Sequence, residues 1–236
     1  CNAISATPTL WRKILMTPGA REIPLKLITL GGEIADQSIL SALKNAFPLA
    51  RVTHIYASTE AGVGFSVTDG LEGFPASYLI APLSSATLRI SKDGILEIQP
   101  LISGQKYLAE ETNLTEHDGF VNTGDRVQLR DERVFFLGRD SGAINVGGNK
   151  VQPEKIEQTL LTHPEIAMVS VVPKRSGITG ALVEARIVLK SGTTESPTIP
   201  MLRQWCVDRL ERYEVPAIIR LLDSLETTAA GKISRQ

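Results

Sequence analysis

The feature that most constrains the fold is a strand–helix–strand pattern near the start of the chain. A short apolar run at Leu25–Leu30 is followed by helical spacing of apolar residues over Asp36–Ala46 and by a second apolar run at Val52–Tyr56. Two strands joined by a helical crossover form a parallel pair. Ligands of such sheets gather at the carboxyl ends of the strands, which here are Leu30–Glu33 and Tyr56–Glu60. We therefore expect an α/β region with a binding edge at these two segments.

The residues on either side carry different patterns. Thr7–Met16 has apolar residues at helical spacing, so we expect a helix almost directly after Cys1. From Thr87 to Leu137 short apolar runs alternate with polar turns. The expected strands are Ala86–Ile90, Ile95–Ile98, Arg126–Leu129 and Val134–Leu137, with turns at Lys92–Gly94, His117–Gly119 and Arg130–Arg133. This spacing predicts an antiparallel or barrel-like β unit.

After Gly138-Arg139 the pattern changes again, to that of a small α+β domain. The expected elements are a glycine-rich segment at Ile144–Val151, helices at Pro153–Leu161 and Thr198–Arg212, and strands at Ile166–Val172, Leu182–Leu189 and Ile218–Leu222. We place the domain boundary near Arg139–Ser141. The first domain covers residues 1–138, with an α/β piece at 1–80 and a β-rich piece at 81–138, and the second covers residues 139–236.

Composition excludes several classes of protein. The 236 residues carry a net charge of −1 with no basic stripe, which argues against a nucleic-acid or acidic-membrane partner. Cys1 and Cys206 are far apart, and the three histidines lack metal-ligand spacing, so neither a disulfide framework nor a zinc site is expected. Two scattered cysteines fit a reducing, cytoplasmic location. The longest apolar runs are of strand length, so we expect no transmembrane segment.

Four short segments carry polar groups suited to chemistry, and each has a purely structural alternative. Tyr56-Ala57-Ser58-Thr59-Glu60 sets a hydroxyl and a carboxylate past a strand, where Mg²⁺ and a phosphate can bind, although polar strand caps are as common. Thr123-Gly124-Asp125 alone is best explained as a simple turn. Gly147-Gly148 alone can be a tight bend, and Lys232 can belong to a solvated tail.

Taken together and in order, these segments resemble the adenylate-forming superfamily of acyl-CoA synthetases, peptide-synthetase adenylation domains and luciferases. The family patterns are matched by Tyr56–Glu60 (YGxTE), Thr123–Asp125 (TGD), Gly138-Arg139 with Ile144–Pro153 and Ile156-Glu157 (GRxDDxIKxxGxxVxPxEIE), and Gly231–Arg235 (GKIxR). Gly31-Gly32-Glu33 also stands where the family has a comparable segment. The resemblance covers essentially the whole chain. It implies the C-terminal part of a large adenylation domain followed by a small mobile C-terminal domain.

The resemblance also implies an activity, in which a carboxylic acid is activated with ATP and then passed to a thiol. The implied nucleotide-binding residues are Gly31, Gly32, Glu33, Tyr56, Ala57, Ser58, Thr59, Asp125 and Arg139. Tyr56 would stack on adenine, Thr59 would contact phosphate, and Asp125 would accept hydrogen bonds from the ribose, a task suited to a carboxylate. Glu60 would hold Mg²⁺. Lys232 would bridge the substrate carboxylate and the α-phosphate, where a fixed positive charge stabilises the developing negative charge.

The same resemblance implies a second step in which a thiol attacks the acyl-adenylate and AMP leaves. The small domain would rotate about a hinge at Ser141, and Gly147 and Gly148 would then line the thiol channel. The acceptor is either coenzyme A or the phosphopantetheine arm of a carrier protein. The acid is undetermined: its pocket would be lined partly by Ala61–Phe65, where Gly62 and Gly64 leave room.

Several positions depart from the family pattern. Ala57 replaces a glycine, the usual hinge aspartates are replaced by Ser141-Gly142, and Lys155 replaces a glutamate, a change expected to alter only a helix surface. The family's phosphate-binding loop, ending in Pro-Lys-Gly, is not found in the 236 residues, and the first residue is not Met. We therefore expect a fragment of a longer enzyme that does not adenylate by itself. The alternatives are a truncated homologue that binds without turnover and an unrelated two-domain protein with chance matches.

Overall fold

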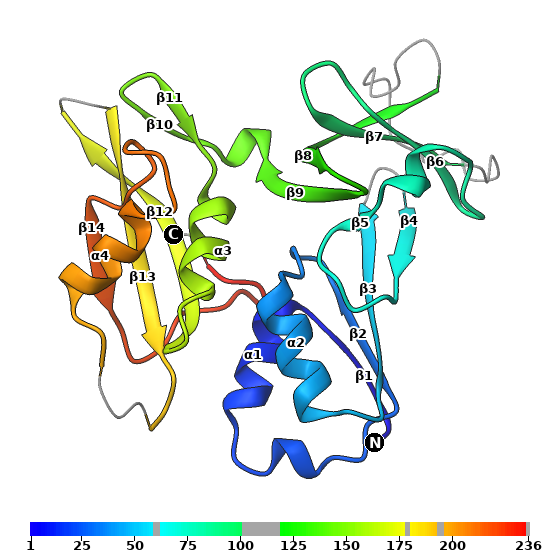
Figure 1. Cartoon of the computed structure of the whole chain (residues 1–236), viewed down its shortest axis with the longest axis horizontal. Coiled ribbons are helices and arrows are strands. Elements are labelled where there is room, and N and C mark those ends of the chain that lie inside the picture. The colour runs from blue at the N-terminus through cyan, green and yellow to red at the C-terminus, as the bar shows by residue number, and fades with distance from the viewer. Residues whose placement is uncertain (59–61, 101–118, 178–179, 193–195, 235–236) are drawn as a thin grey trace. The chain divides into compact units, whose positions relative to one another are not determined.

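The computed structural model describes residues 1–58, 62–100, 119–177, 180–192 and 196–234. The chain divides into two compact units (Figure 1). The first unit contains Cys1–Ser5 and Pro24–Leu137, and the second contains Ala6–Ile23 and Gly138–Gln236.

The first unit contains the expected parallel strand pair. Its first sheet has the order β1-β2-β3-β4, formed by β1 (Ala3–Ala6), β2 (Leu27–Gly31), β3 (Arg51–Ser58) and β4 (Gly62–Val67). Strands β2 and β3 are parallel and joined through helix α2 (Gln37–Ala46), while β4 is antiparallel to β3 (Figure 1). Asp36 caps α2, because its side chain accepts a hydrogen bond from the Ile39 amide at 3.2 Å. The sequence did not predict β1, which lies between Cys1 and the first helix.

A second, antiparallel sheet completes the first unit. Its order is β5-β9-β8-β7-β6, formed by β5 (Phe74–Pro75), β6 (Ala86–Ile90), β7 (Ile95–Pro100), β8 (Val121–Arg130) and β9 (Arg133–Arg139), with a 3₁₀ turn η2 at Ala76–Leu79. Its buried side chains, which include Phe74, Leu88 and Ile98, pack with Phe65 and Val67 of β4 in one apolar cluster. The antiparallel prediction is confirmed, with one correction: Thr123–Asp125 lies inside β8 and is not a turn between strands. The predicted turn residues His117 and Asp118 lie outside the described residues.

The second unit is built on a sheet with helices against it. Its strands are β10 (Ile144–Val146), β11 (Asn149–Val151), β12 (Ile166–Ser176), β13 (Gly180–Leu189) and β14 (Ile218–Leu221), in the order β11-β10-β13-β12 with β14 beside β13. Its helices are α1 (Pro8–Met16), α3 (Pro153–Leu161) and α4 (Ile199–Val207), with 3₁₀ turns η1 (Ala20–Glu22) and η3 (Asp140–Gly142). Ile156, Leu160 and Leu202 of α3 and α4 pack into one core cluster with Val171 and Ala185 of the sheet.

Helix α4 is shorter than the sequence predicted, because it ends at Val207 and not at Arg212. The residues after it turn back, and the Glu214 amide donates to the Glu211 carbonyl at 2.8 Å. The Glu214 carboxylate is buried and accepts two bonds from Lys155 Nζ, at 2.7 and 2.6 Å. The ion pair therefore fixes the segment that follows the helix, where the local spacing of apolar residues predicted further helix.

Candidate active site

The carboxyl ends of β2 and β3 lie side by side in the first unit, as the strand–helix–strand pattern predicted. Gly31, the last residue of β2, is aligned with Ile55 of β3, and Tyr56 follows directly. The Gly31–Glu33 and Tyr56–Ser58 segments therefore leave the sheet at the same edge. Thr59 and Glu60, the predicted phosphate and Mg²⁺ contacts, lie outside the described residues.

A hydrogen bond joins two of the predicted nucleotide-binding residues. The Tyr56 hydroxyl donates to Asp125 Oδ2 at 2.5 Å, although the two residues are 69 positions apart. Hydrogen bonds to an ionised acceptor are shorter and stronger than neutral ones. The fold thus brings the Tyr56 and Asp125 segments to one place, which neither segment could reveal alone.

The ring of Tyr56 is held by aromatic neighbours. It stacks on Phe65 at a centroid distance of 5.3 Å and on Phe136 at 5.2 Å, with interplanar angles of 13° and 10°. Gly64 lies against the same ring, since a Cβ built there would come within 3.1 Å of Tyr56 Cδ1. The space beside Gly64, which the sequence suggested for a substrate, is therefore occupied by the Tyr56 ring.

Asp125 is presented by a local irregularity of β8. Ile95 of β7 is aligned with Arg126, and Glu97 with Asn122, so residues 123–125 stand opposite Leu96 alone. Thr123 is buried and ties this bulge to β7, because its hydroxyl donates to the Leu96 carbonyl at 2.7 Å and accepts from the Asp125 amide at 3.1 Å. Bulges of this kind commonly redirect a side chain beside a functional site.

The other predicted residues fall in the second unit. Arg139 and Ser141 are exposed at the start of that unit, where Asp140 forms an ion pair of 3.6 Å with Lys150. Gly147 and Gly148 form the two-residue turn between β10 and β11, with φ of +57° and +91°. Two consecutive positive φ angles favour glycine at both positions of such a hairpin turn. A Cβ at either glycine would meet nothing within 4 Å, so this turn projects openly from the sheet.

Lys232 is exposed on a tight turn near the C-terminus. Thr227 and Ile233 form an antiparallel bridge across this turn, and the Thr228 amide donates to the Lys232 carbonyl at 2.8 Å. Leu225 and Ile233 anchor the turn in an apolar cluster with Met168 and Val188 of the sheet. The lysine is therefore carried on a fixed backbone with its side chain in solvent.

One prediction about a departure from the family pattern is wrong. Lys155 does not merely alter a helix surface: its ammonium group pairs with Glu214, whose side chain is only 7% exposed. The sequence carried no local signal of this pair, because the two residues are 59 positions apart.

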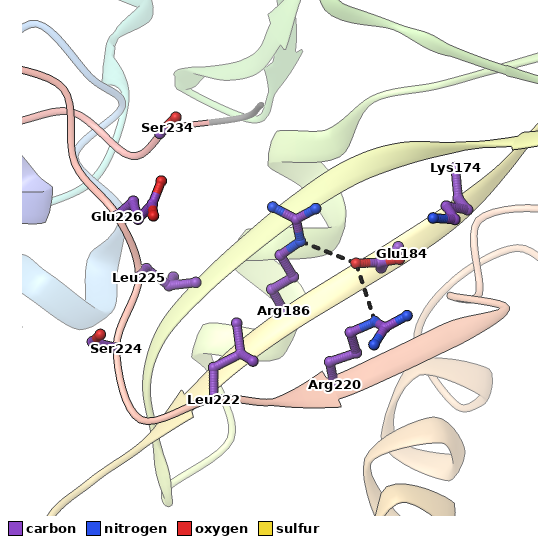
Figure 2. Close-up of a pocket in the computed structure, with 9 residues that line it drawn as sticks. All are labelled: Lys174, Glu184, Arg186, Arg220, Leu222, Ser224, Leu225, Glu226 and Ser234. Atoms are coloured by element: carbon purple, nitrogen blue, oxygen red, sulfur yellow. Dashed lines mark hydrogen bonds and ion pairs between the residues drawn. The ribbon is translucent and has the colours of Figure 1, made fainter.

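The second unit also contains a cavity of about 550 Å³ on its sheet. Figure 2 shows its lining residues, which are Lys174, Glu184, Arg186, Arg220, Leu222, Ser224, Leu225, Glu226 and Ser234. Glu184 is buried and pairs with Arg186 at 3.0 Å and with Arg220 at 3.4 Å. The lining mixes cations with carboxylates, and none of the predicted site residues belongs to it.

Burial changes the acid–base behaviour of a residue close to Tyr56. Desolvation lowers the pKa of His54 in β3, against the opposing effect of Asp69, and its Nε2 atom is buried without a hydrogen-bond partner. Within the described ranges, no group of three or more His, Cys, Asp or Glu side chains is arranged to hold a metal ion. No helix of that same part of the chain is long and apolar enough to cross a membrane.

Comparison with known proteins finds a family model for part of the chain and relatives along nearly all of it. Residues 155–232 match the family model of the AMP-binding enzyme C-terminal domain. The 2-succinylbenzoate–CoA ligase of Bacillus cereus is 28% identical over 256 residues, which cover 99% of this chain and 50% of that enzyme. The 4-hydroxybutyrate–CoA ligase 1 of Metallosphaera sedula is 30% identical over 253 residues, which cover 99% of this chain and 45% of that enzyme. The chain thus spans about half the length of the curated relatives it matches.

Solved structures give the same fold. The anthranilate CoA ligase AuaEII in complex with anthranoyl-AMP superposes with a TM-score of 0.77 at 20% identity, over 98% of this chain and 48% of that one. The amide bond synthetase McbA from Marinactinospora thermotolerans superposes with a TM-score of 0.79 at 20% identity, over 100% of this chain and 51% of that one. The fold is therefore that of adenylate-forming enzymes. Along nearly its whole length the chain is similar to the C-terminal half of acyl-CoA and aryl-CoA ligases of the adenylate-forming superfamily.

Proposed function

We propose that the protein is an AMP-forming acid–thiol ligase. One observation carries this proposal: the hydrogen bond between Tyr56 and Asp125 joins the two segments that must share one nucleotide. In the first step a carboxylate oxygen of the substrate attacks the α-phosphorus of ATP, and pyrophosphate leaves. In the second step the sulfur of a thiol attacks the acyl carbon, and AMP leaves.

The residues of this chain take distinct roles in the proposal. Asp125 accepts hydrogen bonds from the ribose hydroxyls, as a carboxylate can accept several at once, and Tyr56 orients it. Stacking of Tyr56 on adenine stays a prediction, because Phe65 and Phe136 already stack on its ring. Glu60 is the proposed ligand of Mg²⁺, and Thr59 the proposed phosphate contact. Lys232 stabilises the charge that develops when two anions meet at the α-phosphorus. Residues 139–236 form the proposed mobile domain, hinged at Ser141, and Gly147-Gly148 the wall of the thiol channel.

Coenzyme A is the acceptor we favour over a carrier protein. The curated relatives from Bacillus cereus and Metallosphaera sedula are both named as CoA ligases. The acids in the two names differ, since one is an aromatic dicarboxylate and the other a short hydroxy acid. The acid substrate of this protein is therefore undetermined. Cys1 and Cys206 are both free thiols, which supports a cytoplasmic location.

The direct test is ATP–pyrophosphate exchange by the natural full-length protein against aromatic and short aliphatic acids, with Mg²⁺ present and absent. Lys232→Ala should lower exchange by about 10²–10³-fold, the usual effect of losing one such contact. The same variant should still form thioester from supplied acyl-adenylate and coenzyme A. Undiminished exchange in the variant would show that Lys232 does not have this role. Nucleotide binding without exchange for any acid would favour the non-catalytic homologue.

A further inference from the structure

The turn that carries Lys232 is fastened to helix α1 at two points. The Thr7 hydroxyl donates to the Gly231 carbonyl at 2.6 Å, across 224 positions of the sequence. Lys13 Nζ donates to Thr227 Oγ1 at 3.1 Å, across 214 positions. Helix α1 and the turn belong to the same compact unit, although they come from opposite ends of the chain.

The two attachments hold the turn at Thr227, where it begins, and at Gly231, directly before Lys232. Thr227 forms the bridge to Ile233, and Gly231 takes part in the backbone hydrogen bonds within the turn. Thr7 is also the N-cap of α1, where its Oγ1 accepts from the Leu10 amide at 3.1 Å. Thr7 and Lys13 are six residues apart, which spans about 9 Å along a helix. Attachment at two separated points restrains both the position and the rotation of the turn.

We propose that Thr7 and Lys13 are positioning residues for Lys232, which hold its turn on α1 in the conformation that forms the adenylate. This inference rests on the proposed function, because it assigns the contact to one of the two steps. Helix α1 and the turn lie in one compact unit, so the two hydrogen bonds fix the place of Lys232 within that unit. In the proposed reaction Lys232 acts only in the first step, so we assign the contact to adenylate formation.

The chemistry of the contact suits a reversible clamp. It consists of a hydroxyl–carbonyl bond and an ammonium–hydroxyl bond, both only partly buried. Groups that remain close to water exchange protein partners for water at small net cost. The clamp therefore makes a modest contribution to the position of Lys232 during adenylate formation.

The test separates the two steps in the natural full-length protein. Lys13→Met removes the donor but keeps the length of the side chain, and Thr227→Val removes the acceptor with a similar shape. Each should lower ATP–pyrophosphate exchange by about fivefold, the effect of one ordinary hydrogen bond. Thioester formation from supplied acyl-adenylate should stay unchanged, because Lys232 has no proposed role in that step. Arg21→Met is the matched control, because it removes an exposed cation just beyond α1 and should change neither step.

A double variant and a proteolysis measurement test the inference further, and the second does not depend on activity. Lys13→Met combined with Thr227→Val should lower exchange by no more than either change alone, since both changes remove the same contact. In the 236-residue chain, trypsin should cleave after Lys232 faster in the Thr227→Val variant than in the unchanged chain. Additive losses, equal losses in both steps, or unchanged cleavage would overturn the inference. If the Thr227→Val chain is cleaved faster but the full-length protein shows no exchange with any acid, the result supports the clamp and contradicts the proposed function.

Discussion

Tyr56 is the residue on which the candidate site depends most. Its ring is packed against Phe65 and Phe136, and its hydroxyl bonds Asp125. A rigid aromatic side chain costs little conformational entropy to hold in place, so its hydroxyl can orient the carboxylate effectively. The residue thus links the apolar core of the first unit to the polar edge of its sheet.

Tyr56→Phe should weaken the use of ATP without disturbing the fold. The variant keeps the ring stacking but removes the hydrogen bond to Asp125, and a bond to a charged group is worth about 1.5–3 kcal/mol. We expect the KM for ATP in the exchange reaction to rise about tenfold. Tyr78→Phe is the matched control, since the Tyr78 hydroxyl belongs to the same aromatic cluster but donates to the Ser66 carbonyl at 3.2 Å. Equal KM values in the two variants would contradict the role given to Tyr56.

At the scale of elements, the Lys155–Glu214 pair fixes the segment after α4 against α3. Glu214 is 5% exposed and also accepts from the Glu211 amide at 3.1 Å. A buried carboxylate is stable only while its partners are present, because desolvation otherwise opposes its charge. The pair therefore holds the segment between α4 and β14 against α3.

Lys155→Met should destabilise the second unit by about 1–3 kcal/mol. The estimate is below the range of about 3–5 kcal/mol for fully buried pairs, because the Lys155 side chain is 39% exposed. Urea unfolding followed by circular dichroism would measure the loss. Adding Glu214→Gln to Lys155→Met should restore part of the stability, since no buried charge then remains unpaired. A double variant less stable than Lys155→Met would argue against an electrostatic origin.

At the scale of the whole molecule, burial of histidine makes folding sensitive to pH. Desolvation lowers the pKa of His54 in the first unit and of His163 in the second. Above the ordinary histidine pKa of 6.5 both side chains are neutral in the folded and unfolded chain, so they do not affect stability. As pH falls below that value, the unfolded chain binds protons that the folded chain resists, and the free energy of unfolding decreases.

His54→Leu should reduce this loss of stability. Denaturant unfolding of the variant and of the unchanged chain, each at about pH 7.5 and about pH 5.5, would measure it. The drop between the two conditions should be smaller in the variant, while His163 preserves part of it. The same drop in both proteins would show that His54 does not couple folding to protonation.

The amino-acid sequence by itself determined the local elements and the order of the motifs. Helical spacing with Asp36 as cap predicted α2, Pro153 marked the start of α3, and alternating runs and turns predicted most strands of both units. These features follow from propensities and periodicities that act within a few residues, so they can be predicted without knowledge of tertiary contacts. The boundary of domains at Arg139–Ser141 and the roles of the site residues stay predictions.

Only the tertiary structure decided which distant residues meet. It joined Tyr56 to Asp125, filled the space beside Gly64, ended α4 at Val207 and brought the turn of Lys232 onto α1. Each of these outcomes depends on burial, packing or a hydrogen bond between residues far apart in sequence. These contacts contribute to stability only after the chain has folded and brought the distant residues together. Local sequence patterns therefore could not predict them.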